Sequence, residues 1–159
     1  MITLQFVQGN DWQGQLIEWF SHGADYCHVD TVMPDGKLLG ARSDNVGGAE
    51  PGVQLRDPSY VGEAKTLRVD LSVTADQMAK YFSFLSAQLG KPYDMEGILA
   101  FISGRDWHQT DSWFCSELVA AGLEACGFFQ WPLATSSNKM TPPDLLLAIS
   151  SRQKVQLLS

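Results

Sequence analysis

Strand patterns and helix patterns occupy separate stretches of this sequence, and that separation limits the fold more than any other feature. From Thr66 to Val73 apolar and polar side chains alternate, which is typical of a half-buried strand. Thr74 and Gln77 then form a capping box, and the apolar spacing behind them predicts a helix that continues to Gly90. Strands mixed with segregated helices indicate the α+β class, with a mainly antiparallel sheet packed against helices.

The same criteria predict the remaining elements. Further strands are expected over residues 3–7, 26–33, 37–41, 53–56 and 154–158, and further helices over 10–21, 95–101 and 115–125, with a last one opening at Pro142. The glycine-rich loop 43–53 is expected to be mobile and to flank a cleft. No repeat or linker interrupts the 159 residues, so we expect a single domain over 1–159.

Charge and composition exclude several function classes. The chain has 11 basic and 18 acidic residues, a net charge of −7, which argues against nucleic acid as a partner. No apolar run approaches the roughly 18 residues that span a bilayer, and the first residues do not form a signal peptide. We therefore expect a cytoplasmic protein without an integral membrane segment. The sequence gives no indication of its oligomeric state.

The three cysteines further limit the chemistry. Cys27, Cys115 and Cys126 form an odd set, which argues against a disulfide framework. No CxxC or HxxxH spacing is present among the cysteines and three histidines, so neither a metal nor another cofactor is expected.

Cys115 lies where a polar loop runs into an apolar helix. A thiol in the first helical turn is exposed to the positive end of the helix dipole, which lowers its pKa. Free backbone N–H groups at such a turn stabilise an oxyanion. These features make Cys115 a candidate nucleophile, but position alone leaves open the alternative of a small buried core residue, the commoner place for a free cysteine.

A thiolate nucleophile needs a base, and His28 is the best-placed histidine. It lies near the start of a predicted strand, whereas His22 lies at a helix end and His108 in a polar loop. A third residue should orient the imidazole. Asp30 shares a strand face with His28, and Ser43 and Gln54 are the alternatives.

At these residues the chain resembles a known family. The nucleophile segment Phe114-Cys115-Ser116-Glu117-Leu118-Val119, and the strand His28-Val29-Asp30-Thr31-Val32 with the hairpin that follows it, resemble the permuted papain-like amidases and peptidases of the YiiX and YaeF type. These are related to NlpC-like peptidases and to lecithin:retinol acyltransferase-like enzymes. Two further segments, Gly90-Lys91-Pro92-Tyr93-Asp94 and Pro142-Pro143-Asp144-Leu145, resemble their Tyr-Asp element and the start of their last helix.

The resemblance implies a circularly permuted papain-like fold and a cysteine hydrolase. Cys115 and His28 would form a dyad that cleaves an amide through a covalent acyl-enzyme, the substrate being a small amide, a cell-wall peptide or an ester. The relatives carry a polar residue twelve or thirteen positions after the histidine, where this chain has Gly40 and Ala41. The third role is therefore taken by another residue such as Asp30, or is absent. The alternative function is a binding or assembly module that keeps the fold without a working triad.

Overall fold

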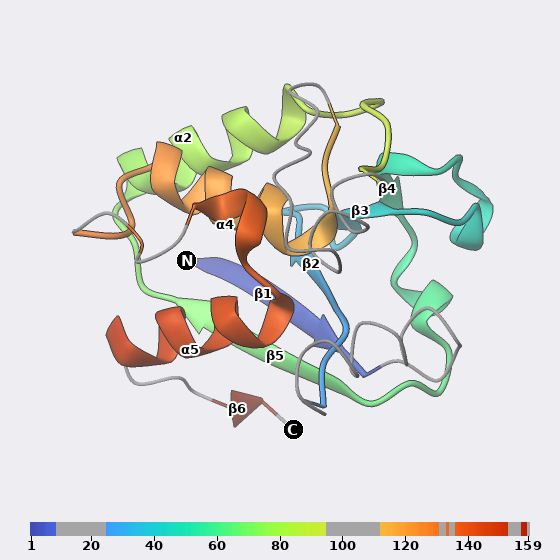
Figure 1. Cartoon of the computed structure of the whole chain (residues 1–159), viewed down its shortest axis with the longest axis horizontal. Coiled ribbons are helices and arrows are strands. Elements are labelled where there is room, and N and C mark those ends of the chain that lie inside the picture. Colours follow the sequence, from blue (N-terminus) through green and yellow to red (C-terminus); the bar gives the residue numbers. More distant parts are fainter. Residues whose placement is uncertain (9–24, 95–111, 131–132, 134–135, 153–156, 159) are drawn as a thin grey trace.

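A six-stranded antiparallel sheet forms the centre of the protein (Figure 1). The computed structural model describes residues 1–8, 25–94, 112–130, 133, 136–152 and 157–158. Within them the strands are β1 (Ile2–Val7), β2 (His28–Val32), β3 (Leu38–Arg42), β4 (Gly52–Arg56), β5 (Thr66–Leu71) and β6 (Leu157–Leu158). Their order across the sheet is β4-β3-β2-β1-β5-β6, and every neighbouring pair is antiparallel.

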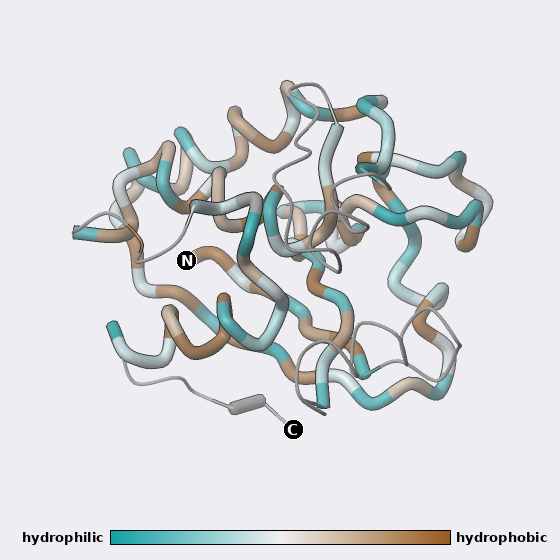
Figure 2. The backbone as a smooth tube through the Cα atoms, in the orientation of Figure 1, coloured by the Kyte–Doolittle hydropathy of each residue, from teal (hydrophilic) through white to brown (hydrophobic). Residues whose placement is uncertain are grey.

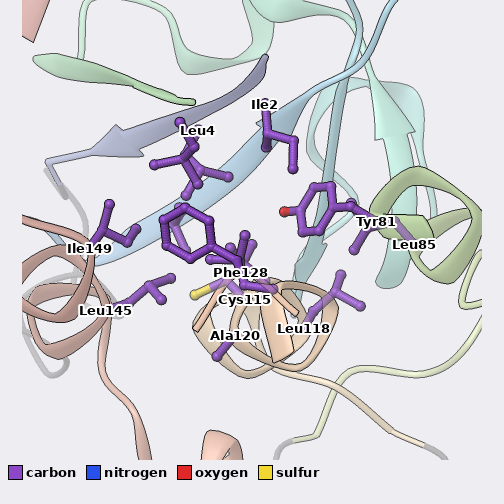
Figure 3. Packing of buried hydrophobic residues seen from close by; sticks show 14 of the residues in the cluster. Ile2, Leu4, Tyr81, Leu85, Cys115, Leu118, Ala120, Phe128, Leu145 and Ile149 are labelled. Carbon is purple, nitrogen blue, oxygen red and sulfur yellow. The ribbon is translucent and has the colours of Figure 1, made fainter. Parts of the chain in front are cut away.

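Three helices and three short 3-10 turns complete the described part. The helices are α2 (Ala75–Ser86), α4 (Cys115–Ala125) and α5 (Pro142–Arg152), and the turns are η1 (Val46–Gly48), η2 (Pro58–Val61) and η3 (Ser137–Lys139). Figure 3 shows α2, α4 and α5 gathered on the same side of the sheet, with the apolar core between. The predicted α+β class, with helices packed on an antiparallel sheet, is confirmed.

The core forms where the apolar face of the sheet packs against the apolar faces of the helices. Every second side chain of β1, at Ile2, Leu4 and Phe6, points into the core from the same face of the strand and is fully buried. They meet Leu118 of α4 and Tyr81 of α2 in one cluster. Burial of each such side chain stabilises the folded state by about 1.5–3 kcal/mol. Figure 2 shows the resulting alternation of hydrophobic and hydrophilic segments along the strands.

Helix α2 begins as predicted and ends earlier than predicted. The Thr74 hydroxyl accepts a hydrogen bond from the Gln77 N–H, and Oε1 of Gln77 accepts one from the Thr74 N–H, so the capping box is confirmed. The helix ends at Ser86 rather than near Gly90. A turn fills the interval, and Gly90 then adopts φ +81°, a conformation that favours glycine. The apolar residue that extended the predicted helix, Leu89, lies in this turn and is exposed.

The other described elements lie close to their predicted positions. Helix α4 spans the predicted residues, and the edge strand near the C-terminus pairs with β5. The predicted helices 10–21 and 95–101 lie outside the described residues. No helix in the described ranges is both long enough and apolar enough to cross a membrane.

The β2–β3 ladder determines where the candidate site forms. Its register pairs are Thr31–Leu39 and Val32–Leu38, so His28 to Asp30 lie beyond the part of β2 that pairs with β3, although they pair with β1. Helix α4 packs against both strands. The start of a helix can therefore approach the backbone of β2 at the unpaired end of the ladder.

Candidate active site

Cys115 is the first residue of α4, and the start of that helix lacks a capping side chain. The residue before it, Phe114, has an extended backbone and makes no side-chain cap hydrogen bond. Glu117 instead accepts a hydrogen bond from the Phe114 N–H at 3.4 Å. Ser116 donates its hydroxyl to the Met140 carbonyl at 2.6 Å, which ties the first turn to the segment before α5. The cysteine thus lies in a fixed first turn, at the positive end of the helix dipole.

A short parallel bridge holds the approach to this helix. Trp113 donates its N–H to the Pro92 carbonyl at 3.1 Å, and Asp94 donates to the Trp113 carbonyl at 3.0 Å. The same segment reaches the sheet, where the Val53 N–H donates to the Lys91 carbonyl at 2.9 Å. The start of α4 is thereby linked to strand β4 through residues 91–94.

His28 and Asp30 form a buried pair on β2. Nε2 of His28 lies 2.8 Å from Oδ1 of Asp30, and the two residues are 7% and 1% exposed. Oδ2 of Asp30 accepts a hydrogen bond from the hydroxyl of Tyr60. Burial alone would raise the pKa of Asp30, but the charge and hydrogen bond of His28, with the Tyr60 hydroxyl, lower it below its usual range. Asp30 is therefore a carboxylate held between two donors.

Cys115 lies near the His28 imidazole. The imidazole and the thiol are near enough for each to shift the pKa of the other, and the backbone at Val29 also favours the thiolate. Nε2 is taken by Asp30, which leaves Nδ1 to face the thiol. Burial opposes charge on both groups, yet the pKa of His28 rises to about 9 and that of Cys115 falls, because each charge stabilises the other and Asp30 stabilises the imidazolium. The balance of burial and charge favours a thiolate–imidazolium pair.

Tyr93 is a further residue close to the thiol. Burial, and next the negative charge of Cys115, raise its pKa well above the usual range, so the phenol keeps its proton. The phenol is therefore neutral at neutral pH and lies within electrostatic range of the Cys115 sulfur. Its segment was noted in the sequence, but a role for the hydroxyl was not predicted.

Gly40 makes room for the Asp30 carboxylate. A Cβ at this position would lie 1.8 Å from Oδ1 of Asp30 and 3.6 Å from Nε2 of His28. No side chain is compatible with that approach. The glycine therefore explains how an acid on the histidine's own strand reaches the ring.

Gly40→Ala is expected to destabilise the protein by about 1–3 kcal/mol, the usual cost of overpacking. Alanine would otherwise stabilise a strand by about 0.5–1 kcal/mol, so the sign of the change is informative. Urea unfolding at pH 7 measures it. Asp30→Ala should relieve the clash, so the double variant should lose less than the sum of the two single changes. Equal stability of Gly40→Ala and the parent would contradict the close approach.

The alternatives for the third residue are placed differently. Gln54 pairs with Gly40 one strand further from His28, and Ser43 follows the end of β3. Neither takes the place of Asp30 at Nε2 of the imidazole. The other two histidines, His22 and His108, lie outside the described residues.

The two remaining cysteines are buried away from this contact. Cys27 donates its thiol to the Val7 carbonyl, and Cys126 donates to the Leu123 carbonyl at the end of α4. Within the described ranges, no group of three or more His, Cys, Asp or Glu side chains is arranged to hold a metal ion.

The glycine-rich loop 43–53 is tied to the histidine side of the site. Arg56 is 1% exposed and donates to the carbonyl oxygens of Gly40, Val46 and Glu50. Arg42, at the start of the loop, forms a two-pronged pair with Asp44 at 2.8 and 2.7 Å. The loop therefore has a defined path beside β3 and β4, and its predicted mobility remains a prediction.

Sequence comparisons add no family to this geometry. The chain matches no protein-family model, and no curated protein is significantly similar to it. The functional argument therefore rests on the residues themselves.

Proposed function

We propose that this protein is a cysteine hydrolase with a circularly permuted papain-like fold, acting on an amide through a covalent acyl-enzyme. One observation carries the proposal: Cys115, at an uncapped helix start, lies within electrostatic range of a buried His28 whose Nε2 is bound to Asp30. Acyl transfer by a thiol needs a nucleophile, a base and a group that orients the base. Cys115, His28 and Asp30 would supply these in that order.

The contacts assign a role to each group. The Cys115 thiolate attacks the amide carbonyl, a carbon–sulfur bond forms, and the carbonyl electrons move to the oxygen. The free N–H groups at the start of α4 stabilise that oxyanion. When the carbon–nitrogen bond breaks, the His28 imidazolium donates its proton to the leaving amine. The neutral imidazole then takes a proton from water, which attacks the thioester, releases the acid and restores the ion pair.

The substrate class follows from the chemistry and the resemblance. A small amide or a cell-wall peptide fits a thiol nucleophile paired with an imidazolium acid, because an amine leaving group needs a proton. An ester would react through the same acyl-enzyme. The proposed location is the cytoplasm.

A substrate screen combined with mass spectrometry tests the proposal. We expect a peptide amide or cell-wall peptide to add its acyl group to Cys115, and Cys115→Ser to lose both the adduct and hydrolysis. Independently, iodoacetamide at pH 6 should label Cys115 faster than Cys27 or Cys126, whose thiols donate to backbone carbonyls. Equal labelling of the three cysteines would remove the basis for the proposal.

A second function is favoured by one observation. Cys115 is 3% exposed and belongs to the apolar core cluster, as Figure 3 shows. A packed cysteine of this kind suits a binding or assembly module that does no chemistry. In that case Cys115 would remain a neutral thiol at pH 6 and would label slowly.

A further inference from the structure

Tyr60 lies far from Asp30 in the sequence, yet it contacts the carboxylate oxygen that His28 does not use. The hydroxyl of Tyr60 donates to Oδ2 of Asp30, whereas Oδ1 lies 2.8 Å from Nε2 of His28. A carboxylate bound at one oxygen still rotates about its Cβ–Cγ bond. One bound at both oxygens has a fixed plane and a fixed direction towards the ring.

Three separate contacts hold Tyr60 where it meets Asp30. Its turn, η2, is capped by Asp57, whose side chain accepts from the Ser59 N–H at 2.9 Å. The guanidinium of Arg42 lies over the phenol ring, 5.2 Å from its centroid. On another side, a Cβ at Gly47 would lie 3.0 Å from the Tyr60 Cβ, so the 43–53 loop packs directly on the residue. Such support exceeds what an exposed tyrosine on a surface turn requires.

We infer that Tyr60 is a positioning residue, which keeps the Asp30 carboxylate aimed at Nε2 of His28 and thereby maintains the Cys115–His28 ion pair. This inference rests on the proposed function for its catalytic meaning. The hydroxyl acts on His28 through Asp30, the group to which it donates. Burial, and next the charge of Asp30, raise the pKa of Tyr60 far above its usual range, so the hydroxyl remains a donor at every working pH.

Other charged groups face this set of residues from the neighbouring strands. Arg42 and Asp44 pair with each other at the end of β3, and Arg56 of β4 donates to three carbonyl oxygens. Both guanidinium groups favour an ionised Asp30. Tyr93 lies on the Cys115 side. Because Tyr60→Phe leaves all of them in place, its effect isolates the hydroxyl.

The test is the NMR titration of the His28 ring in Tyr60→Phe. In the parent, the ring should lose its proton near pH 9. If the hydroxyl positions Asp30, the variant should titrate about one pH unit lower, because an unaimed carboxylate stabilises the imidazolium less. If the carboxylate stayed in place and only lost a donor, it would become more basic and the titration would move up. An upward shift or no shift overturns the inference.

Two further variants provide a reference for the size of the His28 shift and a control. Asp30→Asn removes the charge itself and should lower the His28 titration further than Tyr60→Phe does. Tyr81→Phe is the matched control, because its hydroxyl lies 2.7 Å from Oγ1 of Thr31, also on β2, within the core. It should cost stability without moving the His28 titration.

The outcome is separable from that of the proposed function. The NMR titration needs no substrate and no turnover. If Cys115 labels rapidly in the parent but Tyr60→Phe titrates unchanged, only the positioning role fails. If Cys115 is inert in the parent while Tyr60→Phe still shifts His28, only the catalytic proposal fails.

Discussion

Replacing His28 with alanine is expected to slow alkylation of Cys115 at pH 6 by at least tenfold. The imidazolium is the main group that lowers the thiol pKa against the effect of burial. Without it the helix start alone supports the thiolate, by about 0.3–1 kcal/mol where exposed. The buried carboxylate of Asp30 then opposes the thiolate as well, so the pKa should reach or exceed the ordinary value of about 8.5.

Two opposing effects determine how much His28→Ala slows the alkylation of Cys115. At pH 6 a thiol of pKa about 8.5 is ionised to roughly 0.3%, a loss of several hundredfold from a fully formed thiolate. A more basic thiolate is also more nucleophilic, with a Brønsted slope of about 0.4–0.5, which recovers part of that loss. The net slowing is therefore at least tenfold, and it should shrink as the pH approaches about 9.

The rate is measured by mass spectrometry of peptides alkylated over the range from about pH 5 to pH 9. Cys27 and Cys126 provide internal controls, because their rates should keep the same pH dependence in both proteins. Circular dichroism checks that His28→Ala is folded. An unchanged pH profile of Cys115 in the folded variant would show that His28 does not form the pair.

The fold was largely predictable because its periodic signals are local. The alternation in β5, the capping box of α2 and the apolar face behind Cys115 each fall within about a dozen residues. Prediction was less accurate at the end of α2, where the apolar spacing continues to Leu89, which lies in the turn after the helix and is exposed. Element boundaries depend on such contacts more than element types do.

The candidate site was predictable where its residues share a strand or a helix. Strand alternation placed Asp30 beside His28, and the helix start singled out Cys115. Tyr60 was missed because it lies in a short 3-10 turn without periodicity, thirty positions from the residue it contacts. A signal for Gly40 did exist, since a glycine inside a strand often marks a close approach by another group.

The pH dependence of stability should distinguish the parent from Cys115→Ser without any substrate. Between about pH 6.5 and 8.5 the unfolded chain keeps one proton on the Cys115 thiol and little on the His28 imidazole. The folded protein keeps one proton on His28, whose pKa is about 9, and none on Cys115, whose pKa is lowered. Both states then bind the same number of protons at this pair, so the pair adds no slope to the free energy of unfolding.

Cys115→Ser removes that balance. Serine carries no proton that titrates here, whereas Asp30, the group that raises the His28 pKa most, stays in place, so we expect that pKa to remain above that of an unfolded chain. The folded variant therefore binds one proton more than the unfolded one, and its stability falls as the pH rises, by about 1.4 kcal/mol per unit. The loss continues until the pH passes the His28 pKa that Asp30 maintains alone. Across the window the two proteins should diverge by about 2–3 kcal/mol.

The comparison is made between the two curves because other groups titrate in the same range. Burial raises the pKa of Glu117 to about 7, which lowers stability with rising pH in both proteins alike. Cys126→Ser controls for loss of a buried thiol and should run parallel to the parent. Urea unfolding at half-unit steps of pH gives each curve. If Cys115 were a neutral packed thiol, Cys115→Ser would also run parallel to the parent, and the binding-module function would be the better account of this site.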